Sequence, residues 1–99
     1  MAEYENEGLG VKFTLPDTLT VRQQLLWRGG IALSRGAVFI RGWEGAKHLV
    51  EDWECEMIPD PLAFNLDDET DPAYADIVQY VANATYGHIN DLEAVPKNA

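Results

Sequence analysis

The prolines at positions 16, 59, 61, 72 and 96 limit where regular structure can form in this 99-residue chain. Proline lacks a backbone donor and clashes with the preceding turn, so a helix interior does not accommodate it. The candidate elements are therefore the segments between the prolines.

Val11–Leu15 alternates apolar and polar residues and predicts a short strand, or an extended segment lying on a helical core. The first ten residues, with three glutamates and two glycines, are expected to form a flexible lead-in.

A first helix is predicted after Thr20, because Thr20 and Gln23 have the spacing of a capping box. Its outer side is expected to carry Arg22 and Arg28. Its inner stripe is expected to consist of Val21, Leu25, Leu26 and Leu33. The adjacent Gly29 and Gly30 mark a kink, a break, or a place where another backbone comes close.

A second helix is predicted from Ala37, because apolar residues recur every three or four positions. This stripe consists of Phe39, Trp43, Ala46, Val50 and Trp53. Gly42 and Gly45 flank Trp43 and would let a neighbouring helix approach. Residues 54–70 are then expected to form an acidic loop.

A third helix is predicted from Asp71-Pro72, an N-cap acid followed by proline at the first helical position. Val95-Pro96 closes it. Its inner stripe is expected to consist of Ile77, Val81, Ala84, His88 and Leu92. The sequence thus predicts one small domain over residues 1–99 that is mainly α, with about three helices and a short N-terminal extended segment or strand.

The formal net charge of −10 argues against direct binding of nucleic acid or of an anionic membrane surface. The charge is also uneven: residues 12–47 hold six basic and two acidic residues, whereas residues 51–76 hold ten acidic residues and no basic one. This asymmetry suggests intramolecular pairing, head-to-tail assembly or a charged partner. The alternative interpretation, which involves no partner, is that residues 51–76 form a solvated acidic loop. The candidate charged partner surface consists of Glu51, Asp52, Glu54, Glu56, Asp67, Asp68 and Glu69.

No catalytic residue, metal site or cofactor is predicted. Cys55 is the only cysteine, so no internal disulfide forms, and its glutamate neighbours do not give the electropositive setting that a reactive thiol needs. His48 and Asp52 could converge on one metal ion, but Cys55 lies nearly a full helix turn beyond Asp52, and no paired CxxC or second nearby histidine completes a site. His88 lies on an apolar stripe, where a histidine is more often a hydrogen-bonded core or interface residue. No apolar run is long enough to span a membrane, and the acidic start is unlike a secretory signal.

Three stretches resemble small tail assembly chaperones of long-tailed bacteriophages: FTLPDTLTVRQQL (13–25), WEGAKHLVEDWECEMIPD (43–60) and HINDLEAVPKN (88–98). The likeness covers most of the chain and consists of apolar and aromatic spacing. The resemblance implies a non-catalytic, mainly helical protein that coats the tape measure protein and brings tail tube subunits to it. It also implies that the protein acts in the host cytoplasm, is absent from the mature virion, and has relatives made in a short and a frameshift-extended form.

The candidate partner-binding residues are Trp27, Phe39, Trp43 and Trp53. Trp43 and Trp53 have a second interpretation as core residues, whereas Trp27 lies off the inner stripe and is expected to be exposed. The chaperone hypothesis predicts self-association or partner binding through apolar surface. Its main alternative is an acidic phage inhibitor that mimics nucleic acid and blocks a host DNA-binding or defence protein, which requires carboxylates spaced along a rigid surface. A small enzyme or metal protein is a third hypothesis.

Overall fold

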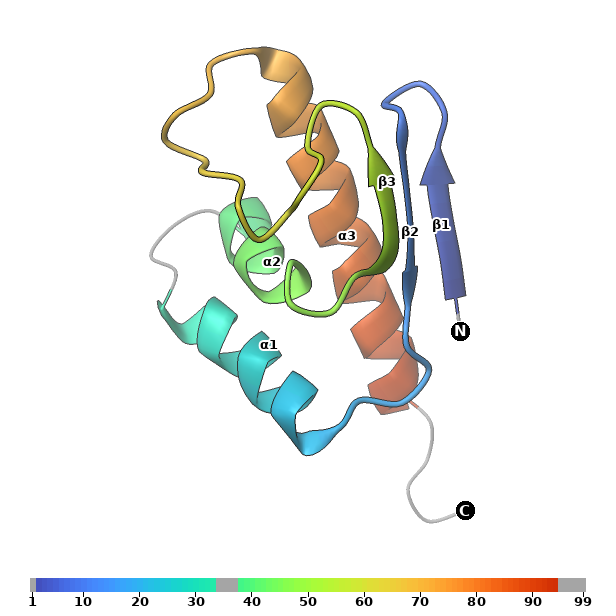
Figure 1. Cartoon of the computed structure of the whole chain (residues 1–99). Coiled ribbons are helices and arrows are strands. Elements are labelled where there is room, and N and C mark those ends of the chain that lie inside the picture. The colour runs from blue at the N-terminus through green and yellow to red at the C-terminus, as the bar shows by residue number, and fades with distance from the viewer. Residues whose placement is uncertain (1, 34–37, 95–99) are drawn as a thin grey trace.

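The computed structural model describes residues 2–33 and 38–94, and within them three helices lie beside a three-stranded antiparallel sheet (Figure 1). The fold is therefore mixed α/β, and the predicted mainly α class is wrong. The difference arises from two segments that were not expected to be strands, one at each edge of the sheet.

The first of these is β1 (Ala2–Asn6), which forms an antiparallel hairpin with β2 (Val11–Leu15). The expected flexible lead-in is wrong, because the first residues alternate between the two faces of a strand and pair along its full length. Tyr4 lies opposite Phe13, and their aromatic rings stack on the inner face of the sheet with centroids 5.5 Å apart. Gly10, at φ 67°, supplies the left-handed conformation that the connecting turn requires.

The second is β3 (Glu51–Cys55), which pairs with the other side of β2. The prediction that the second helix reaches Trp53 is wrong, because α2 (Val38–Ala46) ends before a turn. Beyond that turn, Trp53 and Cys55 point inward and alternate with exposed carboxylates. The acidic loop consequently covers residues 56–71. The predicted helix start at Ala37 lies outside the described residues.

The first helix, α1 (Val21–Leu33), begins at the predicted capping box. The Thr20 N–H donates to Gln23 Oε1 over 2.9 Å, and the Gln23 N–H donates to Thr20 Oγ1 over 3.2 Å. The helix continues without a break through the glycine pair. A Cβ on Gly30 would lie 2.5 Å from the Glu44 carbonyl oxygen, so close backbone approach is the correct interpretation there.

The third helix, α3 (Pro72–Ala94), begins at the predicted proline, and Asp71 Oδ1 caps it by accepting a 2.9 Å hydrogen bond from the Ala73 N–H. Ile77, Val81 and His88 of its predicted inner stripe are buried. The predicted end at Val95-Pro96 lies outside the described residues.

The core lies where α3 passes between the sheet and α2, with α1 packed on α2 (Figure 1). The inner face of β2 is buried, and Phe13 meets Tyr80 of α3 edge to face at 6.3 Å. Gly42 lets α2 approach α3, because a Cβ there would lie 2.7 Å from that of Ala82. Trp43 is fully buried against Trp53, whose ring centroid lies 6.1 Å away.

The predicted inner stripe of α1 is wrong at Val21, Leu25 and Leu26, which are all exposed, and the side chain of Leu33 lies outside the described part of the structure. Val21 is 72% and Leu25 60% exposed, and the helix turns Trp27 inward instead. Trp27 packs on Gly45, where no Cβ is in the way, and meets the Tyr86 ring at 5.3 Å. Close contact through glycine therefore selects the buried side of α1, in place of the stripe of branched side chains.

Candidate partner-binding groove

A surface groove of about 420 Å³ lies between the start of α2, the start of α3 and the loop of residues 56–71. Side chains from all three segments line it, so the groove exists only in the folded chain. Its apolar lining consists of Phe39, Ile40, Phe64, Leu66, Pro72, Tyr74, Ala75 and Val78. We call this feature the acidic groove, because Asp67, Glu69 and Asp71 also line it and none of its described lining residues is basic.

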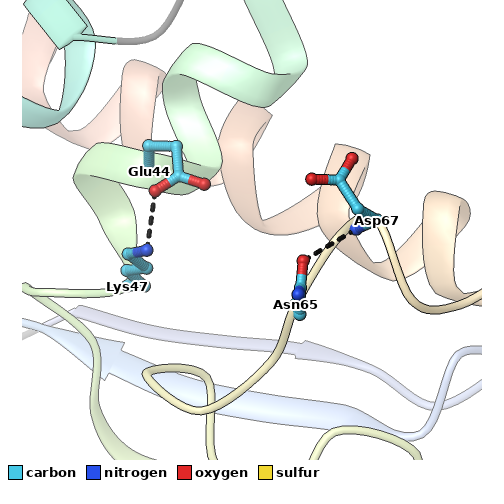
Figure 2. A network of polar contacts seen from close by, with 4 residues as sticks. All are labelled: Glu44, Lys47, Asn65 and Asp67. Carbon is cyan, nitrogen blue, oxygen red and sulfur yellow. Dashed lines mark hydrogen bonds and ion pairs between the residues drawn. The ribbon is translucent and has the colours of Figure 1, made fainter.

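The loop that forms one wall of the acidic groove is held by its own hydrogen bonds and by aromatic packing. The Asp67 N–H donates to Asn65 Oδ1 over 2.9 Å, and Figure 2 shows the Asp67 carboxylate pointing away from this bond. Phe64 stacks on Tyr74 of α3 at 5.3 Å and meets the buried Trp43 ring at 5.9 Å. A wall fixed in this way loses little conformational entropy when a partner binds.

The basic group labelled in Figure 2, Lys47, is paired with a carboxylate outside this wall. Lys47 Nζ lies 2.6 Å from Glu44 Oε2, so the lysine is paired at the end of α2 (Figure 2). The acidic groove thus combines a contact surface suited to apolar side chains with a rim that favours cations.

Of the four predicted partner-binding residues, Phe39 lines the acidic groove. Trp43 is in the core, and the prediction that Trp27 is exposed is wrong, since it is only 8% exposed. Trp53 is half-buried on β3, and its Nε1–H donates to the Ile58 carbonyl oxygen over 2.6 Å. These three tryptophans mainly stabilise the fold.

The sequence did not single out Ile40, Phe64, Leu66 or Tyr74 as site residues. A local signal exists for two of them, because Phe64 and Leu66 are large apolar residues inside the most acidic part of the chain. Such residues in a charged loop indicate packing or binding.

The predicted charged surface divides into two separate parts, both exposed. Asp67, Asp68 and Glu69 belong to the loop, whereas Glu51, Asp52, Glu54 and Glu56 lie on β3 or directly after it. On the outer face of the sheet, β1 adds Glu3 and Glu5. Lys12 of the central strand lies between two of these glutamates, opposite Glu5 of β1 and opposite Glu54 of β3.

A second apolar surface lies on the outer side of α1. Val21 and Leu25 are four residues apart and share one helix face, with Leu26 beside them at 37% exposure. Arg22 and Arg28 are exposed on the same side of the helix. We call these five residues the basic α1 face.

His88 is buried and hydrogen-bonded, which confirms the expectation for a histidine on an apolar stripe. Its Nε2 lies 2.6 Å from the Pro16 carbonyl oxygen, so Nε2–H is the donor, and Nδ1 lies 3.2 Å from Tyr4 Oη. Both ring nitrogens are therefore engaged in joining β1 and the end of β2 to α3. This arrangement fits a structural role.

Within the described residues, no three histidine, cysteine, aspartate or glutamate side chains gather to hold a metal ion. Cys55 is a half-buried thiol on β3. None of the described helices has the length and apolar character needed to cross a membrane.

The fold and the acidic groove together define a small α/β protein with an apolar, acid-rimmed surface groove. Comparisons with protein-family models, with curated proteins and with solved structures found no match.

Proposed function

We propose that this protein is a non-catalytic tail assembly chaperone of a long-tailed bacteriophage. In this role it binds helical segments of the tape measure protein and helps to recruit tail tube subunits during tail morphogenesis. It acts in the host cytoplasm and is absent from the mature virion. The observation that supports the proposal is the acidic groove, an apolar surface in a strongly charged protein. The resemblance of three stretches to such chaperones points the same way.

The acidic groove suits an amphipathic helix. Such a helix presents apolar side chains at every third or fourth position, and Phe39, Ile40 and Leu66 offer them apolar contacts. Lysine or arginine at the edges of the bound segment would face the carboxylates of the rim, which sets orientation and association rate more than affinity. The net charge of −10 would keep the complex dispersed while the tail assembles.

The test is co-expression with the tape measure protein of the same genome, followed by size exclusion with light scattering in low and high salt. The expected result is a soluble complex that persists in high salt, because apolar contacts are not screened. Aggregation of the tape measure protein despite co-expression would contradict the proposal.

Two matched variants locate the binding surface. Ile40→Lys puts a cation into the acidic groove, whereas Leu62→Lys changes another exposed apolar residue, which lies outside the groove lining. The first is expected to abolish the complex and the second to preserve it. Equal binding by both variants would exclude the groove as the client site.

A second candidate function is the acidic inhibitor, and one observation favours it. Glu3, Glu5 and Glu54 lie on paired strands, where alternate side chains repeat about every 7 Å on a rigid surface. A nucleic-acid mimic needs this kind of fixed spacing. Binding of a basic host protein that weakens steeply with salt, and that fails after exchange of these three glutamates for glutamine, would support the inhibitor over the chaperone.

A further inference from the structure

The fold uses one side of α1 and leaves an apolar surface on the other. Trp27 and Gly30 make the contacts with α2 and α3, whereas Val21 and Leu25 project into solvent. Because the buried side already anchors the helix, the exposed side is not needed for packing within this molecule. An exposed apolar face on a regular helix is suited to a groove on another molecule.

The charge of the basic α1 face is opposite to that of the acidic groove. Arg22 and Arg28 are exposed, and α1 contains no aspartate or glutamate. The acidic groove has three carboxylates among its described lining residues, and none of those residues is basic. The two surfaces are thus complementary in both respects, since each combines apolar side chains with charge of one sign.

The start of α1 and the α3 wall of the acidic groove lie at opposite ends of one molecule. Figure 1 shows the first turns of α1 at the bottom of the view and the start of α3 at the top. The molecule is elongated, with extents of 47 × 29 × 19 Å. A contact between different patches on two copies is heterologous, so it leaves one patch of each kind open at the ends of a pair.

We infer that the basic α1 face of one copy docks into the acidic groove of a second copy, so that the protein self-associates head to tail. This inference rests on the proposed use of the groove and deepens it, because α1 then resembles the client segment. Self-association and client binding use the same surface and exclude each other. Self-association therefore covers the acidic groove until a client that binds with higher affinity displaces the neighbouring copy.

The test uses the whole chain without any client, measured by light scattering and sedimentation velocity over a range of concentrations. The wild type is expected to show mass that rises with concentration. Leu25→Glu on the donor surface and Ile40→Lys on the acceptor surface are each expected to weaken self-association about tenfold or more, because a charge is placed in an apolar contact. Leu62→Lys is the matched control and should behave as wild type.

A mixture of the two variants gives the decisive result. Leu25→Glu keeps an intact acidic groove and Ile40→Lys keeps an intact basic α1 face, so an equimolar mixture is expected to form a dimer that does not grow further. Circular dichroism and thermal unfolding of each variant would verify that both remain folded. A monomeric wild type, or a mixture that stays monomeric, would overturn the inference.

The result also separates this inference from the proposed function. A monomeric chain that still binds the tape measure protein would reject self-association and leave the chaperone proposal standing. A chain that forms the mixed dimer but does not bind the tape measure protein would reject the chaperone proposal alone.

Discussion

At single positions, Gly30 is the glycine at which a Cβ would meet the backbone of another helix. A Cβ at this position would meet the Glu44 carbonyl oxygen, whereas a Cβ on the neighbouring Gly29 meets nothing within 4 Å. We expect Gly30→Ala to lower the free energy of unfolding by about 1–3 kcal/mol, because α1 must move away from α2. Gly29→Ala should raise it by up to about 1 kcal/mol through helix propensity. Urea denaturation of the two variants measures both effects, and equal changes would contradict the close approach.

Tyr4 makes stability depend on pH at the alkaline end. Its burial, with added effects of the Asp91 carboxylate and of Tyr80, raises the pKa of the Tyr4 phenol. The unfolded phenol ionises first, near pH 10, so its contribution is complete below about pH 10 and is lost as the pH rises through the folded pKa.

We therefore expect the urea midpoint of the wild type to fall above about pH 10. Tyr4→Phe should reduce this fall, although it also removes the hydrogen bond to His88 and so lowers the midpoint at neutral pH. A fall of unchanged size in the variant would show that Tyr4 does not contribute to it.

At the level of elements, β3 depends on an unusual residue. Asp52 has φ 51°, a left-handed conformation that asparagine and aspartate tolerate better than other non-glycine residues. Its Oδ2 accepts a 3.2 Å hydrogen bond from the Thr14 hydroxyl, which ties the irregular part of β3 to β2.

Asp52→Asn is expected to be nearly neutral, whereas Asp52→Val should cost about 2 kcal/mol or more, since a β-branched side chain is strained at positive φ. Thermal unfolding of both variants measures the difference. A well-tolerated valine would show that the backbone of β3 differs from the one described.

The helix starts were predictable because they depend on local chemistry. Thr20 with Gln23 and Asp71 with Pro72 satisfy backbone groups within a few residues, so their sequence is sufficient. β3 was missed because Trp53 fits two periods: it continues the helical spacing from Trp43, and it also begins the alternation Trp53, Cys55, Met57. The alternation is satisfied only when β2 lies alongside, which is a non-local contact.

The candidate site was predictable only in part, for the same reason. Phe39 and the carboxylates at 67 and 69 could be singled out by residue type and charge. Their assembly with Ile40, Leu66 and Tyr74 depends on how the loop folds against two helices, and no spacing in the sequence encodes that contact. The sequence predicted that the apolar side of α1 faces inward, and that side is exposed. The packed side is instead selected by close contacts at glycines, which a search for apolar side chains does not detect.

For the whole molecule, the net charge of −10 favours expansion, and the outer face of the sheet concentrates that repulsion around Lys12. Lys12→Gln should lower stability by about 0.2–1 kcal/mol for each cross-strand partner that it loses, Glu5 and Glu54. Moderate salt should raise the stability of the wild type and reduce the penalty of the variant, because it screens exposed charges. Urea midpoints at two salt concentrations test this, and a penalty that is independent of salt would point to lost packing instead.

The bond from Tyr4 to His88 joins residues 84 positions apart, and it has a consequence for the order of events during synthesis. The hairpin of β1 and β2 is synthesised before α3, and its inner face stays uncovered until α3 supplies Tyr80 and His88. Such long-range closure is slow compared with the formation of local helices. A nascent chain of this protein therefore exposes the inner face of the hairpin until α3 has left the ribosome, and only then can α3 cover it.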